Sequence, residues 1–130
     1  MRLLIANLLL VLAFAGSSQA SAKRTQDVTV KINTETAAKG GLKIKFASLV
    51  EDSRCPTDTN CVWAGNAKIT VRVTRNGQSK LLTLNTMERG AAPVFAGYRF
   101  KLTGLTPEPR SNIRINRNGY EATIEITKVK

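Results

Sequence analysis

The segment from Glu51 to Asn66 holds the side chains with the most chemistry. It carries both cysteines of the chain, Cys55 and Cys61, its single tryptophan, Trp63, and three of its nine acidic residues. In an oxidising compartment, two cysteines with no others present are expected to form a disulfide. Closing so short a ring stabilises a fold by about 2 kcal/mol in a chain-entropy model. The sequence therefore predicts one disulfide that fixes the shape of one loop.

This loop has a structural interpretation and a functional one. In the structural interpretation, Trp63 packs over the disulfide or into the core, and Gly65 permits a bend into the next strand. Arg54 then holds the loop by a charge-assisted pair with one of three nearby acids, which are Glu51, Asp52 and Asp58. In the functional interpretation, the loop is a rigid recognition element on a β scaffold. Its candidate binding residues are Arg54, Asp58, Asn60 and Trp63.

The same acids suggest a calcium site, because hard cations prefer carboxylate and carbonyl oxygens. Their spacing does not match the calcium loop, in which ligands alternate along the chain. Zinc and copper are disfavoured, since the chain has no histidine and its cysteines are expected to be oxidised. Without histidine or a free thiol, the commonest general bases and nucleophile pairs are also missing. We expect no metal, no cofactor and no catalysis, with a carboxylate-based hydrolase as a minor alternative.

The string from Asp52 to Pro56 (DSRCP), followed after four residues by Cys61 to Gly65 (CVWAG), resembles the hallmark of a known family. Its members are small exported bacterial proteins, often lipoproteins, with no established activity. Weaker matches extend along the chain to Leu84–Thr86, Gly97–Tyr98, Leu105–Pro107 and Tyr120. The resemblance implies a common fold and compartment and supplies no catalytic residues. This chain lacks the lipidation cysteine of the lipoprotein members.

The N-terminal segment Met1 to Ala22 is typical of a signal peptide. It has a basic residue, Arg2, an apolar run from Leu3 to Phe14, and a tail of small and polar residues. The apolar run is shorter than the roughly 20 residues that a transmembrane helix needs. We therefore expect an exported protein, periplasmic or secreted, whose single domain covers residues 23–130.

Most of this domain follows the alternating pattern of half-buried strands. The predicted strands are Asp27–Ile32, Leu42–Phe46, Ala67–Thr74, Ser79–Asn85, Tyr98–Leu102 and Tyr120–Thr127, with a short one at Val94–Phe95. Asn76-Gly77 predicts a two-residue hairpin turn between the third and fourth of these. The only helix candidate, Thr34 to Lys39, would be one or two turns long. The pattern predicts an all-β fold, an antiparallel sandwich of immunoglobulin-like general architecture or a flattened barrel.

The chain is strongly basic, with a formal net charge of +11. Removing the signal peptide takes away one charge, Arg2, which leaves +10. Such a charge favours anionic partners, although it also serves solubility alone. Export and the scarcity of aromatic residues argue against nucleic acid. Seven basic residues alternate with core positions and form a candidate basic face: Lys31, Lys43, Lys45, Lys68, Arg72, Arg99 and Lys101.

Two binding functions follow from these features. The first is a non-catalytic module that binds an anionic cell-envelope polymer through the basic face, with an affinity that falls as salt rises. The alternative is an inhibitor or assembly partner that inserts the Cys55–Cys61 loop into another exported protein and gains affinity from its rigidity. Exposure of Arg54 and Trp63 would favour the protein partner. A buried Trp63 beside one continuous basic patch would favour the polymer.

Overall fold

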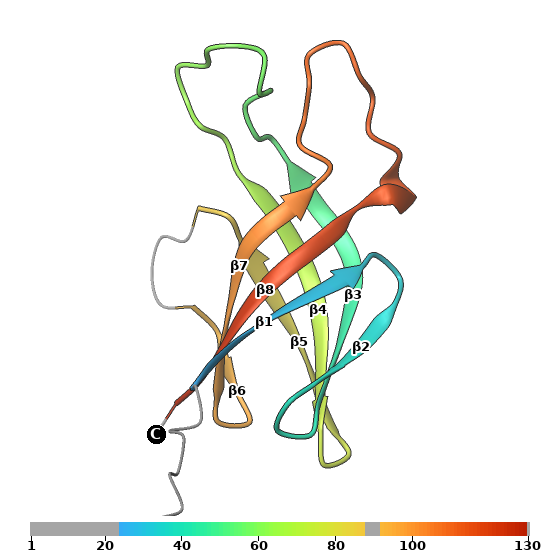
Figure 1. Ribbon diagram of the computed structural model, residues 1–130, viewed down its shortest axis with the longest axis vertical. Helices are drawn as coiled ribbons and strands as arrows, with labels where there is room; N and C mark the ends of the chain where they lie inside the picture. The colour runs from blue at the N-terminus through green and yellow to red at the C-terminus, as the bar shows by residue number, and fades with distance from the viewer. Residues whose placement is uncertain (1–23, 88–91, 130) are drawn as a thin grey trace, which may run out of the picture.

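The computed structural model of the protein describes residues 24–87 and 92–129 (Figure 1). The predicted signal peptide, residues 1–22, lies outside the described residues. Within them, no helix is long and apolar enough to span a bilayer. Eight strands form two antiparallel sheets of four strands each. The predicted all-β fold is therefore confirmed.

The first sheet has the order β1-β8-β7-β6 and the second the order β2-β3-β4-β5. The strands of the first sheet are β1 (Thr25–Lys31), β8 (Glu121–Lys128), β7 (Tyr98–Thr106) and β6 (Val94–Phe95). The strands of the second are β2 (Glu35–Ala38), β3 (Leu42–Asp52), β4 (Ala67–Arg75) and β5 (Gln78–Asn85). A short 3₁₀ helix, η1 (Arg117–Gly119), precedes β8.

The core lies between the two sheets and is apolar throughout the described residues. Its largest fully buried side chains are Phe46 of β3 and Phe100 of β7. Alternation along each strand places one apolar row inward and one polar row outward. The chain crosses from the first sheet to the second directly after β1, where Ile32 forms a bridge to Phe46. This corner joins the sheets, and Figure 1 shows them curling toward each other like part of a barrel.

The predicted hairpin is confirmed. β4 and β5 pair in register up to Arg75 and Gln78. The two turn residues, Asn76 and Gly77, have φ angles of 50° and 77°. Positive φ at both central positions is what a turn matching the strand twist requires, and Asn-Gly adopts it at low cost. The short strand predicted at Val94–Phe95 is also present and pairs with β7.

The prediction of a short helix over Thr34 to Lys39 is wrong. Residues Glu35–Ala38 form strand β2, which pairs with the start of β3. The turn that includes Gly40 reverses the chain, so residues Glu35–Ala38 lie along the unpaired edge of β3 and form hydrogen bonds with it. Glu35 lies across from Lys45 in this pairing, and such opposite-charge pairs stabilise a sheet. A helix of six residues lacks enough hydrogen bonds to compete.

Two β-bulges change which side chains of β3 face the core. The register shifts between Phe46 and Ser48 and again between Leu49 and Glu51. Each bulge inserts one extra residue and reverses the alternation. Leu49 consequently packs against the core, whereas Val50 is 54% exposed. The second shift returns Asp52 to the inner side, across from buried Ala67.

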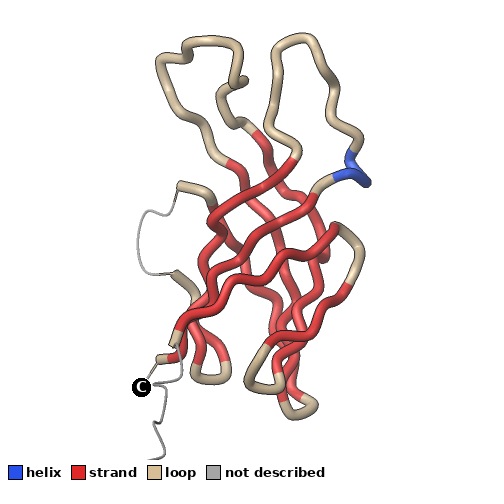
Figure 2. Tube along the Cα trace, in the orientation of Figure 1, coloured by secondary structure: helices blue, strands red, loops and turns tan. Residues whose placement is uncertain are grey.

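Most of the connections lie at two opposite ends of the sandwich (Figure 2). The long β3–β4 loop and the β7–β8 loop lie side by side at one end, which we call the loop end. The tight turns β2–β3, β4–β5 and β6–β7 lie at the other, which we call the turn end.

The bulges can be tested by two substitutions at adjacent positions. Leu49→Ser should lower the free energy of unfolding by about 2 kcal/mol, because it removes an apolar side chain from a partly buried site. Val50→Ser should change it by less than about 0.5 kcal/mol, since that side chain faces solvent. Urea unfolding of both variants measures the difference. If β3 alternated strictly from Phe46, Val50 would face the core, and Val50→Ser would be the more destabilising substitution.

Candidate functional site

The base of the disulfide loop is held by Arg54. Its Nε donates to Asp52 Oδ1 at 2.7 Å and its Nη2 to Asp52 Oδ2 at 2.9 Å, a two-pronged ion pair. The same guanidinium donates to the carbonyl oxygens of Leu105 and Pro107, the latter at 3.0 Å. One side chain thus ties the end of β3 to the end of β7 and the loop after it. Of the three acids that the sequence left open as partners of Arg54, the structure selects Asp52.

Arg54 is not available to a partner as the functional interpretation supposed. Its side chain is only 15% exposed, and that of Asp52 10%. Its donors are directed at a carboxylate and at two main-chain carbonyls within the protein. Arg54 is therefore a structural residue that braces the loop end.

Tyr120, the residue between η1 and β8, completes this network. Its hydroxyl donates to Asp52 Oδ2 at 2.9 Å. Burial, together with this hydrogen bond to the carboxylate, raises the pKa of Tyr120 to about 12. Burial alone would raise the pKa of Asp52, but the hydrogen bonds from Arg54 and Tyr120 and the charge of Arg54 outweigh it and lower that pKa. Asp52 is therefore held as a carboxylate at the centre of the network.

A second set of contacts fixes the outer part of the disulfide loop. Asp58 accepts hydrogen bonds from the backbone N–H of Ser111 at 3.0 Å and from its hydroxyl at 2.6 Å. These bonds lower the pKa of Asp58. The N–H of Thr57 donates to Pro109 O at 2.9 Å. The candidate residue Asp58 is exposed, but its carboxylate binds the neighbouring loop. Asn60, another candidate, lies exposed on the same loop.

The segment leaves the loop at Gly65, as predicted. This residue has a φ of +73°, and a Cβ built there would lie 1.8 Å from Ser53 O. Only glycine lets the two chain segments approach so closely. The approach brings Ser53 and Asn66 together: Ser53 N donates to Asn66 O at 2.8 Å, and Asn66 N to Ser53 Oγ at 3.0 Å.

The predicted disulfide between Cys55 and Cys61 is confirmed, with the two Cα atoms 5.9 Å apart. The packing predicted for Trp63 is wrong. Trp63 is 80% exposed and its neighbour Val62 91% exposed. The network around Arg54 already closes this end of the core, so the indole stays outside. Two large apolar side chains thus stand next to each other in solvent on a braced loop.

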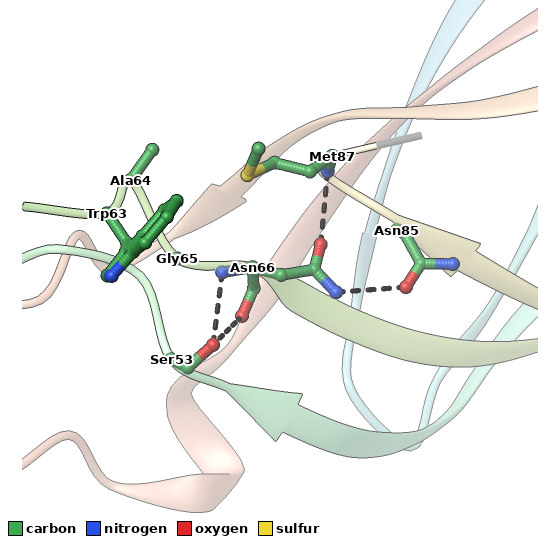
Figure 3. A pocket seen from close by; sticks show the side chains of 7 residues that line it. All are labelled: Ser53, Trp63, Ala64, Gly65, Asn66, Asn85 and Met87. Carbon is green, nitrogen blue, oxygen red and sulfur yellow. Dashed lines mark hydrogen bonds between the residues drawn. The ribbon is translucent and has the colours of Figure 1, made fainter. Parts of the chain in front are cut away.

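A pocket of about 430 Å³ lies beside Trp63 (Figure 3). The indole and the side chain of Met87 form its apolar walls. Beneath them lie Asn66, which directly precedes β4, and Asn85, the last residue of β5. Asn66 Nδ2 donates to Asn85 Oδ1 at 3.0 Å, and Asn66 Oδ1 accepts from Met87 N at 3.0 Å. These bonds fix the floor of the pocket and hold Met87 in place. None of Asn66, Asn85 and Met87 was a candidate binding residue from sequence, although Asn66 ends the disulfide segment and Asn85 lies in the weak family match at Leu84–Thr86.

The three acids that suggested calcium do not converge. Asp52 faces Arg54 and Tyr120, Asp58 faces Ser111, and Glu51 accepts a hydrogen bond from Ser53 Oγ at 3.1 Å. In the described part of the chain, no three metal-ligating side chains form a cluster. The structure gives the calcium hypothesis no support.

The seven basic residues of the candidate basic face divide between the two sheets, so only some of them share one face. Lys43, Lys45, Lys68 and Arg72 belong to β3 and β4 of one sheet, whereas Lys31, Arg99 and Lys101 belong to the other. In the second group, Lys31 pairs with Glu121 and Lys101 with Glu125 across the strands. The acids of β8 therefore offset the charge on that sheet.

A different set of cations lies beside the disulfide loop. Arg110, Arg114 and Arg117 are exposed on the β7–β8 loop and in η1, at the same end of the molecule as Trp63. In the sequence this stretch carries no strand pattern and no motif. Its proximity to the loop follows from the contacts of Arg54 and Asp58, which join segments about 50 residues apart.

Comparisons of the chain with models of protein families, with curated proteins and with solved structures find no match.

The close approach at Gly65 predicts a large cost for a single methyl group. Gly65→Ala should lower the free energy of unfolding by about 3 kcal/mol, because strain at positive φ adds to a collision with Ser53 O. Gly41→Ala is the matched control: φ is +73° there too, but a Cβ meets nothing within 4 Å. It should cost only about 1 kcal/mol. Equal losses in thermal or urea unfolding would contradict the close approach.

The lowered pKa of Asp52 predicts a pH dependence of stability. As pH falls below about 5, the unfolded chain, with an aspartate pKa of about 3.9, takes up a proton before the folded one does, so stability is lost. Asp52→Asn should lower stability by about 2 kcal/mol at pH 7 and flatten this acid decline. Urea unfolding between pH 7 and pH 3 tests it, with Asp27→Asn, an exposed site, as control. An unchanged slope in Asp52→Asn would rule out this role.

Proposed function

We propose that this protein is an exported, non-catalytic binding module that recognises another exported protein through the tip of its disulfide loop. One observation carries the proposal: Val62 and Trp63 are almost fully exposed on a loop whose base and outer part are both fixed. The signal-peptide pattern and the disulfide support an exported location.

The loop is prepared for binding before any partner arrives. The disulfide, the Arg54 network and the Asp58–Ser111 contacts hold its backbone, so little conformational entropy is lost on association. Tryptophan is the residue type most enriched among those that dominate interface energies. An exposed Trp63 on a rigid support therefore fits an anchor that inserts into a cleft of the partner.

The pocket beside Trp63 would accept a side chain of the partner, while Trp63 itself enters the partner's cleft. Its walls are an indole and a thioether, and Met87 is a flexible side chain that adapts to different shapes. A volume of about 430 Å³ admits one apolar side chain of the partner. The partner would thus receive Trp63 and insert a side chain of its own next to it.

The positive charge at the loop end suggests which residues surround the partner's cleft. Arg110, Arg114 and Arg117 are exposed on the β7–β8 loop and η1, and Asp58, which the β7–β8 loop contacts, is already hydrogen-bonded to Ser111. A partner with an acidic rim would be attracted to this end, and its association rate would fall as salt rises. We infer an apolar cleft bordered by carboxylates.

A second candidate function is binding of an anionic polymer, now restricted to the basic residues on β3 and β4. Lys45 lies directly across from Arg72 on the outer side of β3 and β4. Like charges facing each other destabilise a sheet, and a bound anion would relieve the repulsion. Glu35, paired with Lys45 on its other side, already does so in part. We therefore rank this function second.

The proposal predicts that Trp63→Ala strongly weakens capture of the partner without affecting the fold. Purified protein is immobilised and exposed to envelope proteins of the same organism, and specific partners are identified by photo-crosslinking from position 62. Affinity should fall by about 30-fold or more, because a central tryptophan contributes about 2 kcal/mol or more. Thermal unfolding should be unchanged, since the indole is exposed.

Leu81→Ala is the matched control, because Leu81 is an exposed apolar residue on β5, outside the pocket. It should leave capture intact. If the paired change Lys45→Gln and Arg72→Gln abolished retention on the envelope while Trp63→Ala did not, the polymer candidate would replace the proposal.

A further inference from the structure

The turn end of the sandwich contains a second pocket, of about 770 Å³. It lies between the start of β1, the β2–β3 turn, the start of β7 and the end of β8, far from the disulfide loop (Figure 1). Its size is within the range of pockets that take small-molecule ligands. Nothing in the proposed function uses it.

The pocket is positively charged. Arg24, Lys39 and Lys128 line it, against a single acid, Asp27. The only ion pair among the described residues is that of Arg54 with Asp52, so the three cations of the pocket have no carboxylate partner there. Three uncompensated cations around one concave surface attract an anion.

Tyr98 supplies a directed donor inside the pocket. It is only 8% exposed, yet its hydroxyl forms no hydrogen bond with any described residue. A hydroxyl that lines a pocket and has no protein partner is free to donate a hydrogen bond to a ligand there. Gly40 lies next to it: a Cβ at Gly40 would come within 2.2 Å of Tyr98 Oη. Glycine at this position leaves the hydroxyl its space.

The walls of the pocket are fixed across the two sheets. Gln26 of β1 clamps Lys39 by accepting from its N–H at 3.0 Å and donating to its carbonyl at 2.9 Å. Arg75 of β4 lies over the Tyr98 ring, 5.3 Å from its centre, and donates to Gly40 O at 3.0 Å. Both sides of the opening are therefore held in one arrangement, as a binding site requires.

We propose that this pocket binds an oxyanion carried on a small polar molecule or on one unit of a polymer. The hydroxyl of Tyr98 donates to an anionic oxygen, and Arg24, Lys39 and Lys128 neutralise its charge. The volume exceeds what a free inorganic ion needs, so the ligand extends beyond the charged group. Phosphate esters and uronic acids both present this chemistry.

Isothermal titration calorimetry of the mature protein at fixed ionic strength tests the site with three probes: inorganic phosphate, glycerol phosphate and glucuronate. We expect saturable binding of glycerol phosphate or glucuronate that is tighter than that of inorganic phosphate. Tyr98→Phe should weaken it about tenfold, because it removes one hydrogen bond to a charged group. The triple change of Arg24, Lys39 and Lys128 to Gln should abolish saturable binding.

The triple change of Arg110, Arg114 and Arg117 to Gln removes the same charge from the loop end and should leave affinity within about twofold. Binding of glycerol phosphate alone would identify the ligand group as a phosphate, and binding of glucuronate alone as a carboxylate; both results support the site. Absence of saturable binding, an equal loss in the loop-end variant, or no effect of Tyr98→Phe would overturn it. Because the probes are not proteins, these outcomes are independent of the Trp63 experiment.

Discussion

The two-pronged pair of Arg54 with Asp52 determines how one end of this sandwich is closed. The carboxylate lies on the inner side of β3, where Tyr120 from the opposite sheet donates to it, and the guanidinium reaches the carbonyls of Leu105 and Pro107. Three segments that are distant in sequence meet at these two side chains. Breaking such a pair leaves a partly buried charge without its partner, which costs far more than the pair contributes over an apolar replacement. The network therefore fixes the arrangement of the loop end and tolerates few changes.

The exposure of the apolar loop tip follows from this closure. With the end of the core occupied by a charged network, the loop that begins at Arg54 has no apolar cavity to enter. The disulfide, Gly65 and the contacts of Asp58 to Ser111 then hold the loop outside the core. Exposed clusters of large apolar side chains are uncommon on proteins without a partner for them. The same interactions that make the loop rigid thus make Val62 and Trp63 available for binding.

The two ends of the molecule expose surfaces of different chemistry. At the loop end, opposite charges are paired and apolar side chains face solvent. At the turn end, cations without a carboxylate partner surround the Tyr98 hydroxyl, and side-chain to main-chain hydrogen bonds of Gln26 and Arg75 link the two sheets. The first surface suits an apolar cleft of a protein, and the second an oxyanion. Each can be altered by substitution without touching the other.

Local patterns in the sequence determined seven of the eight strands, the Asn76-Gly77 hairpin, the disulfide and the bend at Gly65, because each depends on residues close in sequence. They also limited the acid partner of Arg54 to three candidates. Other features were decided only by tertiary structure. β2 forms because a strand edge is available, the bulges of β3 select Leu49 over Val50, and the seven basic residues divide between two sheets. The exposure of Trp63 and the Tyr98 pocket likewise depend on contacts between segments tens of residues apart, and alternation along one strand carries no information about which strand lies next to it.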